Sequence, residues 1–185
     1  MTSPPDDPCP LERVDPSPEV SACSDVESLL KFVELQSLVG QSEDGQLYLT
    51  PSAIRQDDLK GGKRSVSTLR CQHTPRSEIL RRGLLINAAP LWADDPLAVI
   101  AVVASLRAIK DASARREVCV YAEPTTSAED KLGACPTHAG LKRSTKGPDD
   151  KSKLQWAVLR GEVAKCFTRF VHIVSDLDVT KGFQK

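Results

Sequence analysis

Apolar residues first become periodic along this chain after Ser24. Four of them have the spacing that places side chains on one helical face: Val26, Leu29, Leu30 and Val33. Ser24 and Glu27 have the spacing of a capping box, in which each side chain bonds the backbone amide of the other residue. Gly40 provides a C-terminal end, because glycine readily adopts the conformation that follows many helices. The pattern therefore predicts a helix over 24–39.

Three later positions combine a capping side chain with a proline, which suits the first position of a helix. They are Thr50-Pro51, Thr74-Pro75 and Asp95-Pro96. They predict helices over about 51–59, 75–82 and 96–110, of which the first two end at glycines.

The third of these predicted helices contains the longest apolar run of the chain, eight residues from Leu97 to Ala104. A helix that is apolar on every side is expected to be buried centrally. A buried strand over Val99–Val103 is the competing interpretation, because periodicity alone does not separate the two. The cations Arg107 and Lys110 favour the helix, since positive charge suits a helix C-terminus.

Alternating apolar and polar residues predict three short strands, at 46–50, 117–123 and 154–158. Residues 163–174 are expected to be helical into about 169 and then to form a strand, although the pattern from Phe170 onward fits a strand equally well. Residues 124–153 are mostly polar and contain several glycines and prolines. This segment is too long for an ordinary connection, so it is expected to be a mobile polar loop or a functional one.

These elements predict an α+β fold, a small mixed domain of about four helices and three to four strands over 24–185. Residues 1–23 hold six of the thirteen prolines and several acids that repel one another. They cannot bury enough apolar surface to offset the entropy lost on ordering. We therefore expect a disordered acidic, Pro-rich tail over 1–23 in front of a single domain.

Charge is segregated along the chain, although Lys+Arg and Asp+Glu both number 25. Residues 1–30 carry seven acids against one base, and residues 55–82 carry eight bases against three acids. Basic side chains contact phosphates and other acidic groups without reading sequence. The basic segment predicts a binding face made by Lys60, Lys63, Arg64, Arg70, Arg76, Arg81 and Arg82. The competing interpretation is a solvated face paired with the chain's own acidic tail.

The six cysteines are scattered, and the chain begins with no basic n-region and no apolar h-region. We therefore expect reduced thiols and a cytoplasmic or nuclear location. Cys119 and Cys166 lie in apolar segments and are expected to behave as small core residues. A bilayer span needs about twenty apolar residues, so no transmembrane segment is predicted.

Two Cys/His pairs are candidates for metal or catalytic chemistry, Cys71-x-His73 and Cys135-x-x-His138. Together they would supply two sulfurs and two nitrogens to zinc, but neither pair has the spacing of a recognised zinc site, so no metal and no cofactor are predicted. Either pair would form a thiolate–imidazole site only if the fold allowed it. The sequence contains no G-x-S-x-G, P-loop or H-E-x-x-H motif.

Three partial resemblances complete the sequence evidence. His73-Thr74, followed by Ile79 and Gly83-Leu84, resembles the opening motif of ADP-ribosyltransferases; the Tyr and Glu that come later in that family are not assigned here. The predicted helix 24–39 with the strand at 46–50 resembles the last helix and wing of a winged-helix fold, whose earlier helices residues 1–23 cannot supply. The tail and small domain together resemble the layout of small viral matrix-type proteins.

We therefore expect a non-enzymatic interaction or structural protein, self-assembling and matrix-like, that uses the basic 55–82 face on an acidic partner. That partner is another protein or a second copy of the chain. A nucleic-acid-binding module is the first alternative, and an enzyme with a Cys/His site is the second.

Overall fold

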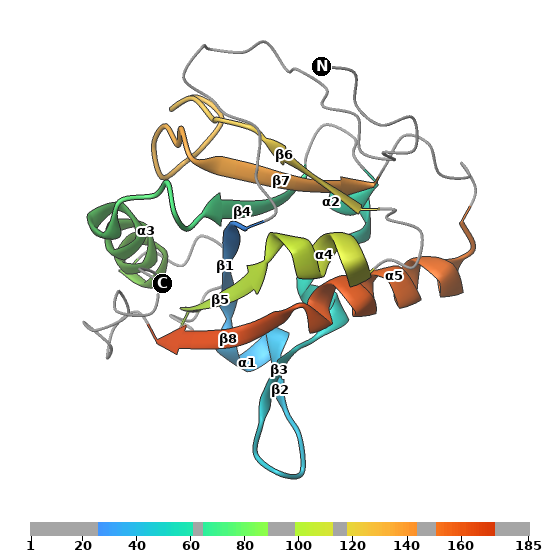
Figure 1. Ribbon diagram of the computed structural model, residues 1–185. Coiled ribbons are helices and arrows are strands. Elements are labelled where there is room, and N and C mark those ends of the chain that lie inside the picture. The colour runs from blue at the N-terminus through green and yellow to red at the C-terminus, as the bar shows by residue number, and fades with distance from the viewer. Residues whose placement is uncertain (1–25, 61–64, 89–98, 113–117, 144–150, 173–185) are drawn as a thin grey trace.

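The computed structural model describes residues 26–60, 65–88, 99–112, 118–143 and 151–172. Six strands form one antiparallel sheet in the order β6-β7-β4-β1-β5-β8, and two more form a separate hairpin that projects from the domain (Figure 1). The strands of the sheet are β1 (Ser28–Glu34), β4 (Val66–Arg70), β5 (Val99–Ser105), β6 (Val118–Ala122), β7 (His138–Arg143) and β8 (Phe167–His172). The hairpin is β2 (Val39–Gln41) and β3 (Leu47–Leu49).

Helices lie on both faces of the sheet and at its ends. They are α1 (Leu35–Leu38), the 3₁₀ helix η1 (Pro51–Ala53), α2 (Gln56–Leu59), α3 (Arg76–Ala88), α4 (Leu106–Ala112) and α5 (Lys153–Lys165). The fold is thus α+β as predicted. It is richer in strands than expected, with eight in the described residues instead of three to four.

The core consists of two apolar clusters, one on each face of the sheet. Leu29 and Val33 of β1 pack with residues of α2, α4 and α5 on one face. Leu30 of β1 and Leu69 of β4 pack with Ile79 of α3 on the other. Side chains alternate along a strand, so a central strand covered on both faces must be apolar at successive positions. This requirement explains the sequence of β1 and β5.

The helix predicted over 24–39 is wrong, because its first half is strand β1 and only Leu35–Leu38 is helical. Leu29 and Leu30 are both completely buried, on opposite faces of the sheet. A central strand with apolar residues on both faces contains helical spacings by coincidence. Glu27, assigned to a capping box, instead binds Arg70 across the chain.

The helix predicted over 96–110 is also wrong in its first half, where the competing strand interpretation is correct. Residues 99–105 form β5, which pairs with β1 along its whole length and with β8 on its other edge. α4 then begins at Leu106, and Lys110 lies in its last turn. Arg107 and Lys110 therefore do lie in a helix, as predicted, but this helix begins only after the apolar run.

The strand predicted over 154–158 is wrong, since these residues belong to α5. Ser152 caps this helix: its hydroxyl oxygen accepts a hydrogen bond from the backbone amide of Gln155, and its own backbone amide donates one to Gln155 Oε1. Trp156, Leu159 and Val163 face the core at helical spacing. Leu154 and Val158 are 74% and 57% exposed, whereas Trp156 between them is buried. The apolar alternation that predicted a strand therefore combined residues that face outward with one that faces the core.

Residues 124–153 include β7, which the sequence analysis assigned to a loop. β7 lies between β6 and β4 and carries only one large aliphatic residue, Leu141, so its pattern is not that of a typical strand. The predicted strands at 46–50 and 117–123 are confirmed as β3 and β6. The helix from Pro75 is confirmed as α3, which continues past Gly83, and the 51–59 helix is divided into η1 and α2.

The other sequence-based predictions concern the C-terminal helix and strand, the N-terminal tail, the cysteines and membrane spans. α5 ends at Lys165 and β8 begins at Phe167, earlier than the predicted change near 169. The tail over 1–23 and the Asp95-Pro96 start lie outside the described residues. Cys71, Cys135 and Cys166 carry free thiols, whereas Cys119 is disulfide-bonded, which differs from the expected reduced state. None of the described helices is long and apolar enough to cross a bilayer.

Candidate binding site for an acidic partner

Arg70, a predicted binding residue, is buried in an ion pair at the end of β4. Its Nε and Nη2 donate to the two carboxylate oxygens of Glu27 at 2.8 and 2.7 Å. His73 Nε2 lies 3.5 Å from the same carboxylate. Because the side chains of Arg70 and Glu27 are only 4% and 5% exposed, the pair ties β4 to the start of β1. Removing one partner of such a pair costs about 3–5 kcal/mol of stability.

Arg82 is likewise buried, with 3% of its side chain exposed. It donates to Glu78 in α3 and to Asp130, both at 2.6 Å, and to the carbonyl oxygens of Gly133 and Ala134. These bonds hold the loop after β6 against α3. The guanidinium group therefore uses its donors inside the protein.

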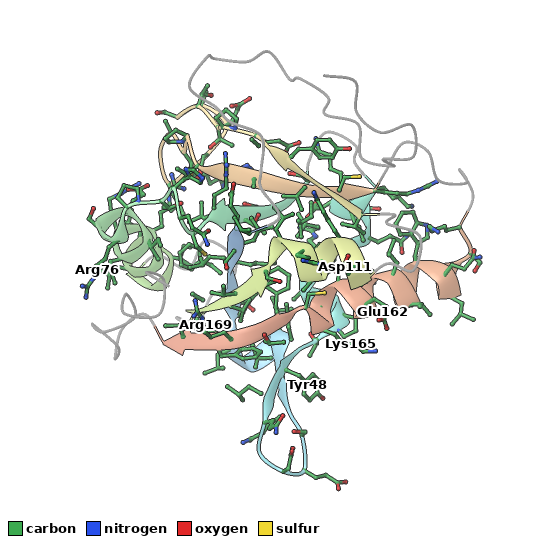
Figure 2. The ribbon with its side chains drawn as sticks, viewed as in Figure 1. Tyr48, Arg76, Asp111, Glu162, Lys165 and Arg169 are labelled. Carbon is green, nitrogen blue, oxygen red and sulfur yellow. The ribbon has the colours of Figure 1, made fainter. Side chains whose placement is uncertain are left out.

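Arg81 and Arg76 lie on the outer side of α3. Arg81 is 45% exposed and donates two hydrogen bonds to Glu78, which hold the pKa of that carboxyl at about 2. Arg76 is exposed at the first residue of the helix and extends away from the domain (Figure 2). Both side chains are exposed, but Arg81 also donates to the backbone oxygen of Leu132 at 2.8 Å.

Lys60 is exposed at the end of α2. Since α2 precedes β4 and α3 follows it, the strand separates Lys60 from Arg76, and the two helices lie at opposite ends of the sheet (Figure 1). Lys63 and Arg64 lie outside the described residues. The described members of the predicted site are therefore divided between two ends of the domain and its interior.

At the Lys60 end, two cations converge on one aromatic ring. Lys60 Nζ lies 5.6 Å from the centroid of the Trp156 ring, and Arg143 Cζ lies 5.8 Å from it. Trp156 is 4% exposed and belongs to the first half of α5. Cations within about 6 Å of a ring are attracted by its negative face, by about 0.5–2 kcal/mol. We call Lys60, Arg143 and Trp156 the Trp156 cluster.

Of this cluster, only Lys60 belongs to the binding face predicted from the sequence. Arg143 ends β7, which was assigned to a loop, and Trp156 was assigned to a strand. Lys151 and Lys153 at the start of α5 add positive charge close to Trp156 in the chain. The sequence feature that could have identified Arg143 is the basic composition of residues 142–153, which lie outside the basic segment 55–82.

Lys31 of β1 lies on the same sheet face as Leu29 and Val33, because side chains alternate along the strand. Burial lowers the pKa of its ammonium group to about 8, and Asp58 of α2 opposes this shift. Lys31 is half-buried and lies close enough to Asp58 for the two charges to interact.

The two Cys/His pairs do not form thiolate–imidazole sites in the described structure. Burial raises the pKa of Cys71 to about 12, which keeps its thiol protonated. Cys135 is completely buried, and its sulfur lies 3.7 Å from Thr137 Oγ1. His138 bonds Ser67 and the Glu123 backbone instead. Within the described ranges, no group of three or more His, Cys, Asp or Glu side chains is arranged to hold a metal ion.

Comparison with protein families, curated proteins and solved structures finds no match for this chain.

Proposed function

We propose that this chain is an interaction protein that binds an acidic protein partner through the Trp156 cluster. The convergence of Lys60 and Arg143 on one ring carries the proposal. A cation held by a ring loses less conformational freedom on binding than a freely moving side chain. Arg143 has the planar donor geometry that suits a carboxylate, and Lys60 adds a point charge.

The surroundings of the cluster favour discrete carboxylates over a nucleic-acid backbone. Asp57 and Asp58 lie in α2, three and two residues before Lys60. A duplex presents one negative charge per about 1.7 Å, so a bound phosphate backbone would also meet these acids. A protein partner carries separate carboxylates, which can pair with Lys60 and Arg143 without lying close to Asp57 and Asp58. A second copy of the chain is one such partner, because residues 1–30 carry seven acids against one base.

The test measures binding of the full chain to poly-L-glutamate by fluorescence anisotropy. Lys60→Glu is expected to weaken binding about tenfold, the effect of one well-placed charge pair. Lys131→Glu makes the same change of charge on an exposed loop residue near α3 and serves as the matched control. Arg76→Glu tests whether the far end of the originally predicted face also takes part. Equal loss in Lys60→Glu and Lys131→Glu would show only a general charge effect and would contradict the proposal.

Light scattering coupled to size exclusion separates the kinds of partner. A mass that rises with protein concentration and is lost in Lys60→Glu would identify a second copy as the partner. Binding to duplex DNA but not to poly-L-glutamate, weakening steeply between two salt concentrations, would favour the nucleic-acid alternative.

A further inference from the structure

A polar patch lies on the opposite side of β4, β7 and β6 from the large core cluster. Its members are Ser65, Ser67, Tyr121, Glu123, His138 and Lys142. In the strand register both Ser67 and Tyr121 lie opposite Gly140, and side chains two residues apart share a face. The six residues therefore lie on one face of three adjacent strands. None of them belongs to the Trp156 cluster.

Ser67 and His138 form the central contact of the patch. Ser67 Oγ lies 2.9 Å from His138 Nε2, and His138 Nδ1 lies 2.8 Å from the backbone oxygen of Glu123. A carbonyl oxygen only accepts hydrogen bonds, so in the neutral ring the proton sits on Nδ1. Nε2 then carries a lone pair and accepts the hydroxyl proton of Ser67. A hydroxyl, a base and a group that orients the base are the three parts of an activated nucleophile.

The protonation state of His138 suits a base. Burial lowers the pKa of its ring, and the charge of Arg82 acts in the same direction, while its bond to Glu123 and the charges of Glu123 and Asp130 oppose the shift. A histidine whose pKa lies below its ordinary value is neutral at pH 7. Ser67 itself is exposed, so a substrate can reach its hydroxyl.

The rest of the patch is organised around Glu123, whose backbone oxygen accepts the hydrogen bond from His138. The Glu123 carboxylate accepts a hydrogen bond of 2.6 Å from Ser65 and pairs with Lys142. Glu123 and Ser65 occupy the space that a side chain on Gly140 would need. Glycine at 140 therefore allows Glu123 to fold over the strand beside the Ser67–His138 pair. Lys142 supplies the charge that balances the Glu123 carboxylate on the same face.

We propose that Ser67 and His138 are a nucleophile and its general base in an acyl-transfer site for accessible carboxylic esters. Ser67 Oγ attacks the ester carbonyl carbon as its proton moves to His138 Nε2. The bond from that carbon to the alcohol oxygen breaks, and Nε2 returns the proton to the departing alcohol. Water then attacks the acyl-Ser67 carbonyl carbon and gives a proton to Nε2. The bond to Ser67 Oγ breaks, the acid leaves, and Nε2 restores the serine hydroxyl.

The test treats the folded full chain with a fluorophosphonate probe, which labels activated serines, and follows hydrolysis of p-nitrophenyl acetate. Ser67 is expected to carry the label in peptide mass spectrometry. Ser67→Ala is expected to lose the label, and His138→Gln to slow labelling at least 100-fold, the usual contribution of a general base being about 10²–10⁴. Ser77→Ala, at an exposed serine of α3, is the matched control and keeps full labelling.

The outcomes separate this site from the binding proposal. Lys60→Glu should leave the label unchanged, and Ser67→Ala should leave poly-L-glutamate binding unchanged. The pH at which the labelling rate falls to half its maximum should lie below 6.5, because burial lowers the pKa of His138. Wild-type protein that is folded by circular dichroism yet unlabelled would overturn the proposal. So would equal labelling of Ser67→Ala and Ser77→Ala.

Discussion

Lys31 shows how one residue's surroundings set its chemistry. In the sequence it is one of 25 Lys and Arg residues and nothing distinguishes it. In the fold it lies on a core-facing side of the central strand β1, close enough to Asp58 and Arg55 for their charges to act on it. Burial is the larger effect, since a charged ammonium is poorly solvated there. The consequence is a measurable dependence of stability on pH.

We expect the fold to gain stability from Lys31 as the pH rises from about 8 toward 10.5. The folded-state pKa of about 8 lies below the ordinary 10.5, so in this window the unfolded chain binds more protons than the folded one. Lys31→Met should therefore be more stable than wild type at pH 7, with the difference shrinking by about 1–3 kcal/mol by pH 10.5. Urea unfolding at several pH values measures this difference.

The comparison with a variant isolates Lys31 from other titrations. Burial raises the pKa of Cys71 to about 12 and of Cys166 to about 11, so both thiols reduce stability above their ordinary pKa of 9.0. They do so equally in wild type and variant. Lys131→Met, which removes an exposed lysine, is the matched control for the loss of a positive charge. A difference between Lys31→Met and wild type that stays constant with pH would show that Lys31 is not desolvated.

At the scale of elements, buried arginines decide how helices and loops are attached. Arg82 links α3 to Asp130 and to two backbone carbonyls of the loop after β6. Arg82→Met is expected to lower the free energy of unfolding by about 3–5 kcal/mol, because Asp130 and Glu78 lose a buried partner. Chemical denaturation measures the loss. Arg76→Met, on the exposed side of the same helix, should change stability by less than about 0.5 kcal/mol. Similar losses in both variants would show that the buried ion pairs do not attach the loop.

Sequence patterns identified elements well where only one side of an element is apolar. β6 and the start of α3 were predicted because the prolines beside them, Pro124 and Pro75, agree with their periodicity. β1 was taken for a helix because a strand buried on both faces has no period of two. α5 was taken for a strand because Leu154 and Val158 are apolar yet exposed. Local periodicity cannot report which sides of an element will be covered.

At the scale of the whole molecule, the acidic N-terminal segment is the counterpart of the basic surface. Residues 1–30 carry seven acids against one base. If the segment competes with an acidic partner for the Trp156 cluster, deleting residues 1–23 should raise the affinity for poly-L-glutamate several-fold at low salt, since opposite charges attract over about 10 Å at 0.1 M salt. Anisotropy titrations of both chains measure the change. Replacing the acids in 1–23 with their amides should have the same effect, and unchanged affinity in both variants would contradict the competition.

The sequence by itself determined the α+β class, the ends of several elements and the segregation of charge, because these depend on composition and on neighbours along the chain. Only the tertiary structure decided which charges are available. Arg70 and Arg82 form buried ion pairs with Glu27 and Asp130. Arg143 lies beside Lys60 at the Trp156 ring, although the two residues are 83 positions apart in the chain. Ser67 and His138 likewise meet only because β4 and β7 are neighbours. Contacts between distant residues depend on strand order, and no local pattern in this chain encodes that order.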